Sequence, residues 1–235
     1  MLLTVIVSTL LAGLAMPLGA ILACVEKIGP DWIEEEFRHS VIAFGGGALL
    51  SAIALILVPE GIANLKPLPA SISFIAGGLF FMALDVFFYK MDTPASQLAA
   101  MLSDFIPESI ALGAAFATGS DTAFLLAGLI ALQNLPEGFN ACRELNSSPA
   151  YSRIAIISFF LLMALLGPIA GVSGYLWLNN SPVIVGTIML FASGGILYSI
   201  FQDIAPQVKL EKHYAPPMGA ILGFVLGLIG FMVTT

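Results

Sequence analysis

Eight long apolar runs, separated by short polar or proline-containing connections, are the feature that most restricts how this chain can fold. A transmembrane helix needs about 20 mostly apolar residues, and each run is close to that length. The connections supply too few charges for a water-facing surface, because charged residues make up 10% of the chain against about 25% in a soluble domain. We therefore predict an all-α membrane protein, a single domain of eight transmembrane helices. The expected spans are residues 2–25, 40–62, 70–90, 97–117, 122–142, 153–178, 182–205 and 216–234.

Basic residues are distributed unevenly between the two sides of this arrangement. Only Lys66 falls in a connection on one side. The connections on the other side carry Lys27, Arg38, Lys90, Arg143, Arg153, Lys209 and Lys212. Because cytoplasmic connections are enriched in Lys and Arg, the second side is expected to be cytoplasmic and both termini extracytoplasmic. The connection 27–39, which contains Trp32 and Phe37, fits either a short interfacial helix or a solvated connection.

Net charge and cysteine usage narrow the classes of partner. A net charge of −7 argues against a nucleic-acid partner, and much of it is carboxylate inside the apolar runs, which suits a cationic substrate. Cys24 and Cys142 are the only cysteines, and both fall near predicted membrane edges. Two cysteines on the reducing side of a membrane do not form a disulfide framework, so we expect two unpaired thiols.

Two pairs of spans repeat each other. Residues 44–59 align without gaps with residues 191–206, with the same Phe-to-Pro spacing, and 104–109 align with 133–138. Members of each pair cross the membrane in opposite directions under the expected topology. Inverted repeats are typical of transporters, whose sites lie near the midplane at the repeat interface. The alternative, for the first pair above all, is that glycine-rich membrane helices resemble one another by composition.

The second pair of repeats places carboxylates deep in the membrane. Asp104 and Glu108 are four residues apart and therefore share a helix face, as do Gln133 and Glu137, with Asn140 one turn further. A carboxylate at the bilayer centre costs about 2.5–3.5 kcal/mol, so such residues usually face a cavity on a substrate path. Neighbouring carboxylates also repel one another unless a proton or cation neutralises them. A divalent metal ion meets that requirement.

A proline precedes each of these glutamates. Pro107 and Pro136 each deprive a carbonyl four residues earlier of its helical donor, and a bend is expected at both. The bend opens space beside the carboxylates, and a freed carbonyl can itself coordinate a cation. The alternative is a kink whose carboxyl group is satisfied locally.

The two motifs resemble those in the fourth and fifth helices of the ZIP (Zrt/Irt-like) family of divalent metal transporters. The fifth-helix match, Gln-Asn-Leu-Pro-Glu-Gly over 133–138, is close, and the eight spans and outward termini also fit, so the resemblance covers essentially the whole chain. It implies transport of a divalent cation of the Zn, Fe or Mn class towards the cytoplasm, with an elevator-like movement of part of the bundle. The chain is then no enzyme, the metal is substrate rather than cofactor, and the location is the bacterial inner membrane. The implied metal ligands are Asp104, Glu108, Gln133 and Glu137.

Departures from the family pattern refine these expectations. Phe105 replaces the family's asparagine and Gly167 its sixth-helix glutamate, so we expect one metal rather than two, with Asn134 and Asn140 as weaker candidate ligands. The family's histidine-rich loop is absent between Tyr89 and Gln97. Carboxylate and amide oxygens favour harder ions than imidazole does, which shifts the expected preference towards Mn(II) or Fe(II), with Zn(II) and Cd(II) as alternatives.

Three further carboxylates lie near the expected path. Glu60 is expected at the outer entrance and Asp203 near the inner exit, whereas Asp85 fits either scaffold or pathway. For each, a solvated helix end or a local hydrogen bond is an equal alternative. The expected partners are a metal cation and the lipid bilayer, with a homodimer left open. Two other functions remain as alternatives: a metal sensor or scaffold derived from a transporter, and an intramembrane metal-dependent hydrolase, which the absence of a histidine-rich or nucleophile motif disfavours.

Overall fold

The computed structural model describes residues 1–25, 31–91, 95–147, 151–178, 181–208 and 214–235, and all regular structure in these ranges is helical. Two long rods are continuous through a π-helical segment: α2, η1 and α3 form one, and α8, η2 and α9 form the other. The helices are α1 (Leu2–Val25), α2 (Asp31–Ala52), η1 (Ile53–Leu57), α3 (Val58–Ile62), α4 (Pro67–Met91), α5 (Ala95–Thr118), α6 (Ala123–Ser147), α7 (Arg153–Leu178), α8 (Pro182–Ser199), η2 (Ile200–Ile204), α9 (Ala205–Val208) and α10 (Ala215–Thr234).

Each of the eight predicted runs is helical, and one helix begins nine residues before its run. The second run was expected from residue 40, but α2 begins at Asp31 and is continuous from there. A solvated connection is therefore wrong for residues 31–39, which extend the helix; residues 26–30 lie outside the described residues. The other bounds agree with the expected spans within a few residues.

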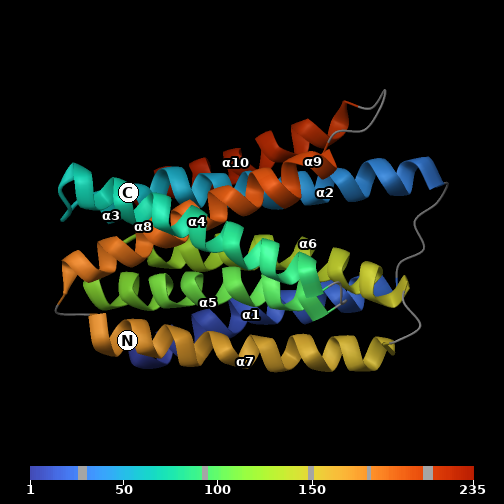
Figure 1. Cartoon of the computed structure of the whole chain (residues 1–235), viewed down its shortest axis with the longest axis horizontal. Coiled ribbons are helices and arrows are strands. Elements are labelled where there is room, and N and C mark those ends of the chain that lie inside the picture. The colour runs from blue at the N-terminus through green and yellow to red at the C-terminus, as the bar shows by residue number, and fades with distance from the viewer. Residues whose placement is uncertain (26–30, 92–94, 148–150, 179–180, 209–213) are drawn as a thin grey trace.

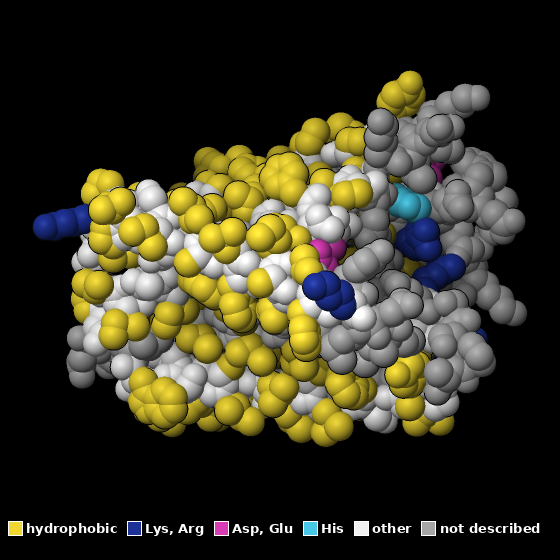
Figure 2. All heavy atoms as spheres, in the orientation of Figure 1, with side chains coloured by type: hydrophobic (Ala, Val, Ile, Leu, Met, Phe, Trp, Pro, Cys, Tyr) yellow, Lys and Arg dark blue, Asp and Glu magenta, His cyan; other side chains and the backbone are white. Residues whose placement is uncertain are grey.

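Six of the described helical stretches are long and apolar enough to cross a membrane. They are Leu2–Cys24, Glu36–Ile62, Pro67–Phe87, Arg153–Trp177, Pro182–Ile204 and Ala215–Thr234. Helices α5 and α6, which carry the two motifs, do not reach that apolarity. Hydrophobic side chains cover much of the face in Figure 2, and basic side chains are few on it. Exposed apolar groups on long helices are what a lipid-facing surface requires, since helices satisfy their own backbone hydrogen bonds.

The helices pack as two bundles (Figure 1). In the first, α1 packs closely on α6 and α7, and α5 packs on α7; in the second, α2 packs on α10, and α4 packs on α8. The main contacts between the bundles are those of α2 with α6, α5 with α8, and α4 with α5. Both termini lie at the same end of the molecule.

Glycines let the backbones within each bundle touch. In the first bundle, a Cβ on Gly138 of α6 would collide with the backbone of Met16 in α1; in the second, a Cβ on Gly223 of α10 would collide with the backbone of Phe44 in α2. Small residues at such crossings allow close helix approach, and van der Waals packing then holds membrane helices together.

Across the interface between the bundles, by contrast, the atoms nearest to the glycines belong to side chains. Gly45 of α2 faces the ring of Pro136 in α6, and Gly230 of α10 faces the side chain of Leu125 in α6. The closest glycine-to-backbone crossings thus lie within the bundles, whereas the nearest atoms to the glycines at the shared interface belong to side chains.

Both copies of the first repeat contain a π-helical segment at the same position. The π-helical segments η1 and η2 each begin nine residues after the phenylalanine that opens the repeat, Phe44 or Phe191. In both, the first residue after the segment donates its N–H to the carbonyl five residues earlier. The two rods run in opposite directions along the molecule (Figure 1). Such π-helical turns occur frequently at functional sites.

The crossing of α1 and α6 predicts a specific loss of stability. Gly138→Ala places a methyl group against the Met16 backbone, and overpacking of this kind costs about 1–3 kcal/mol. Gly128→Ala is the matched control on the same helix, because nothing lies within 4 Å of its Cβ position. Thermal unfolding in detergent should show a lower midpoint for Gly138→Ala only; equal midpoints would contradict this account of the crossing.

Candidate metal site

The two motif helices, α5 and α6, are joined by a tight turn that places their motifs at comparable depth. Gly119 opens the turn with φ of 72°, a conformation that glycine adopts without steric cost. Pro107 and Pro136 lie inside helices that continue through them. The expected bends therefore do not interrupt either helix, and the motif side chains stay on regular helix faces.

Gln133 lies between the two motif glutamates. Its Nε2 donates long hydrogen bonds to Glu108 Oε2 at 3.4 Å and to Glu137 Oε1 at 3.5 Å. Glu108 and Gln133 are each only 2% exposed. The structure thus brings three of the four predicted ligands together, with the amide group of one helix linking carboxylates from both.

Asp104, the fourth predicted ligand, is half-buried and has a different partner. Its Oδ1 accepts a hydrogen bond from Ser199 Oγ of α8 at 3.4 Å, across the interface between the bundles. It also interacts electrostatically with Glu137, Glu108 and Asp203. No group of three or more His, Cys, Asp and Glu side chains is close enough to hold a metal ion within the part of the chain that the structure describes.

Several acceptors in the α6 motif are buried without a hydrogen-bond partner. They are Gln133 Oε1, Asn134 Oδ1 and Glu137 Oε2. Asn134 is fully buried, and its Nδ2 donates to the carbonyl of Ala12 at 2.9 Å, which orients the side chain towards α1. An unsatisfied buried acceptor costs about 1–3 kcal/mol. Three such oxygens within five residues of one helix form an environment that a cation would stabilise.

A small cavity adjoins Gln133 and Glu137. Its volume is about 30 Å³, enough for one water-sized occupant. It lies on the side of Gln133 nearer the C-terminus of α6, and Asn140 lines it as the sequence suggested, whereas Asn134 does not. Both bundles contribute to its walls, which are formed by Ile42, Gly45, Gly46, Gln133, Pro136, Glu137, Asn140 and Ile204.

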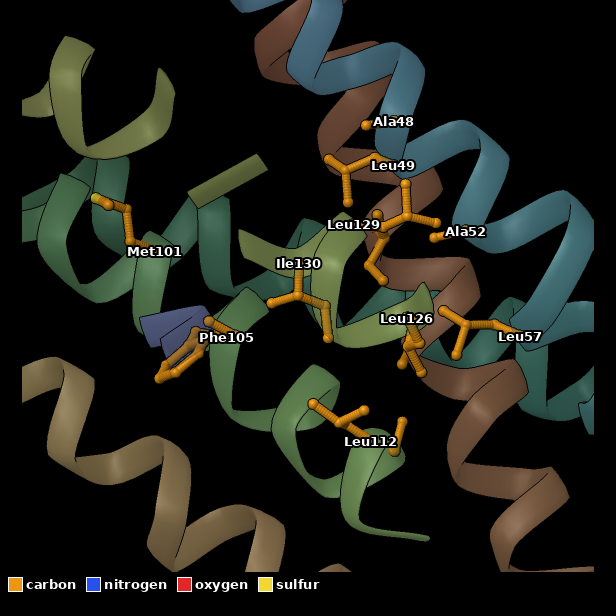
Figure 3. Close-up of a cluster of buried hydrophobic side chains, with 14 of the residues drawn as sticks. Ala48, Leu49, Ala52, Leu57, Met101, Phe105, Leu112, Leu126, Leu129 and Ile130 are labelled. Atoms are coloured by element: carbon orange, nitrogen blue, oxygen red, sulfur yellow. The ribbon is translucent and has the colours of Figure 1, made fainter. Parts of the chain in front are cut away.

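On the other side of Gln133 the helices are sealed by apolar side chains. Figure 3 shows side chains from α2 and η1, α5 and α6 converging, and all of them are buried. Those on the side of the α5–α6 turn include Leu49, Leu57, Leu112, Leu126 and Leu129. The site is therefore bordered by a cavity towards one end of the molecule and by packed hydrocarbon towards the other.

Glu60, the expected entrance residue, does not lie at the motif site. Its Oε1 accepts hydrogen bonds from Ser120 Oγ at 2.5 Å and Thr122 Oγ1 at 2.6 Å, which ties α3 to the α5–α6 turn. Ser120 and Thr122 also hydrogen-bond to each other at 2.8 Å. The carboxylate thus joins the two bundles near the turn, a role that its position at a helix end did not reveal.

Asp85 lies on α4, and Asp203 lies on η2 in the rod formed by α8, η2 and α9. Asp85 Oδ2 accepts a hydrogen bond from Tyr198 of α8 at 3.0 Å, which supports a scaffold contact. Asp203, on η2, is exposed and interacts electrostatically with Asp85. The sequence analysis missed Tyr198 and Ser199; two adjacent polar residues inside an apolar run were the available signal.

Comparison with known proteins adds no relative. The sequence matches no protein-family model and no curated protein. The resemblance to ZIP transporters therefore rests on the two motifs and the internal repeats of this chain.

The hydrogen bonds of Glu60 are expected to stabilise the turn between α5 and α6. Glu60→Ala removes the acceptor of two hydroxyl groups, and for a partly exposed group we expect a loss of about 1 kcal/mol. Hydrogen–deuterium exchange should become faster in residues 118–122. Asp121→Asn, a change on an exposed side chain in the same turn, is the control, and unchanged exchange in Glu60→Ala would contradict the assignment.

Proposed function

We propose that this protein transports divalent metal cations across a membrane towards the cytoplasm, binding them at Glu108, Gln133 and Glu137 with Asp104 as a further ligand. The observation that carries the proposal is one amide in contact with two glutamates, the buried Glu108 and the half-buried Glu137, with acceptor oxygens beside them that lack a hydrogen-bond partner. The metal is the substrate, and no catalytic role is proposed.

The Gln133 amide occupies the position that a cation would take. Its N–H group lies between two carboxylates, but a neutral amide cannot cancel two negative charges. Rotation about the terminal torsion of the side chain exchanges Nε2 with Oε1, since this torsion is broad and roughly two-fold. An incoming metal then meets an amide oxygen instead of a donor, together with Glu137 Oε2. A divalent cation would balance the charge of the two glutamates.

The position of the site between the bundles supports a moving-bundle mechanism. The cavity has walls from both bundles, and Asp104 reaches Ser199 across the interface. The close glycine-to-backbone crossings lie within the bundles, whereas the glycines at the interface meet side chains first. Displacement of the α1, α5, α6 and α7 bundle along the other would open the site first to one side and then to the other. Eight spans with both termini outside, in the bacterial inner membrane, complete the proposal.

The ligand set argues for a harder ion than zinc. Every proposed ligand atom is a carboxylate or amide oxygen, and such oxygens suit Mn(II) and Fe(II) better than imidazole or thiolate would. We therefore propose Mn(II) or Fe(II) as the preferred substrate.

Flux measurements test the proposal directly. In proteoliposomes, Glu137→Gln and Glu108→Gln should each reduce Mn²⁺ uptake and Mn²⁺ binding at least tenfold, corresponding to about 1.4 kcal/mol. Asp121→Asn makes the same acid-to-amide change on an exposed turn and should leave both unchanged. Full flux in Glu137→Gln would refute the site, and binding without flux in the unmodified chain would instead identify a metal sensor.

A second measurement tests selectivity. Gln133→His replaces an amide by imidazole, which should raise uptake of Zn²⁺ relative to Mn²⁺ in a competition assay. Gln133→Asn, which keeps the amide chemistry, is the control and should not raise that ratio. A strong preference of the unmodified chain for zinc over manganese would contradict the oxygen-ligand argument.

A further inference from the structure

The two cysteines of the chain are in contact. Cys24 Sγ and Cys142 Sγ lie 3.7 Å apart although the residues are 118 positions apart in the sequence. Both are free thiols, and no third cysteine exists in the chain. The sequence indicated unpaired thiols near membrane edges and gave no reason to expect them side by side.

The close crossing of α1 and α6 brings the thiols together. A Cβ on Gly19 of α1 would collide with the backbone of Leu135, and Gly138 of α6 stands against Met16 in the same way. Cys24 and Cys142 follow these glycines by about one turn each. Cys142 is 1% exposed, whereas Cys24 is half-buried, so the pair is accessible from the α1 side and shielded on the α6 side.

The sulfur separation fits a bridging metal ion better than a disulfide bond. Two thiolates on a tetrahedral zinc ion, each at about 2.3 Å, lie about 3.8 Å from each other. A disulfide needs about 2.05 Å between the sulfurs. The observed 3.7 Å, at which one thiol can also donate to the other, is therefore already close to the sulfur separation on a zinc ion. The pair also lies at the end of the helices expected to face the cytoplasm, where thiols remain reduced.

We propose that Cys24 and Cys142 form a second metal site, a dithiol that binds a thiophilic divalent cation such as Zn²⁺ or Cd²⁺. Binding converts both thiols to thiolates, forms two metal–sulfur bonds and releases two protons, and water completes the coordination. Cys142 and Glu137 are five residues apart on α6 and so lie about 140° apart around it. The dithiol faces α1, whereas the carboxylate site faces the cavity. The two sites are separate in place and in ligand chemistry, so this inference does not depend on the proposed function.

Cadmium titration of the purified full chain tests the site. Cd²⁺ bound by thiolates gives an ultraviolet ligand-to-metal charge-transfer absorption that carboxylate ligands do not produce. We expect this absorption to saturate at one Cd²⁺ per chain, with release of two protons. Cys24→Ser, at the half-buried position, and Cys142→Ser should each weaken Cd²⁺ binding at this site at least tenfold. Glu137→Gln should retain the absorption.

The outcomes separate the two sites. Loss of the absorption in Cys24→Ser together with unchanged Mn²⁺ flux supports a dithiol independent of transport. Absence of the absorption in the reduced, unmodified chain overturns the proposal, as does its persistence in both serine variants. The proposal is also overturned if a thiol reagent detects no free thiols on the chain in the presence of reduced glutathione, because the two sulfurs would then form a disulfide. If Cys142→Ser does not fold, Cys24→Ser alone decides.

Discussion

The Gln133 amide of α6 contacts two carboxylates, Glu108 of α5 and Glu137 one turn further along its own helix. Two carboxylates buried among apolar helices repel each other and lose their hydration, which is expensive unless a positive group compensates. A neutral amide satisfies part of their hydrogen bonding but none of their charge. Gln133 Oε1 and Glu137 Oε2 accept no hydrogen bond from the described residues. Under the proposed function, a cation would balance the negative charge and bind these oxygens.

The packing of the two bundles determines what borders the site on each side. The backbone contacts at glycines such as Gly138 and Gly223 keep each bundle as one body. The site lies where the two bodies meet, with a cavity on one side of Gln133 and packed leucines on the other. Glu60 adds a hydrogen-bonded connection between the bundles beyond those leucines. A site bordered so unequally belongs to one state of an alternating cycle under the proposed function.

Much of the site could be predicted from the sequence because it depends on local geometry. The four-residue spacing of Gln133 and Glu137 requires a shared helix face in any helix, and the structure keeps them in contact. The equal spacing in 44–59 and 191–206 indicated a repeat, and η1 and η2 occupy the same place in both copies. The π-helical hydrogen bonding itself has no compositional signal, so it could not be predicted.

By itself, the sequence determined which stretches are helical and which helix faces carry carboxylates; of the eight expected spans, six are apolar enough to cross a membrane in the described residues. Tertiary structure alone decided the partner of each polar group: Ser199 for Asp104, two hydroxyl groups for Glu60, and Cys142 for Cys24. The physical reason is that helical periodicity relates residues within one helix. The rotation and offset between helices depend on glycine crossings spread along the chain, whose pairing becomes visible only when the helices are packed.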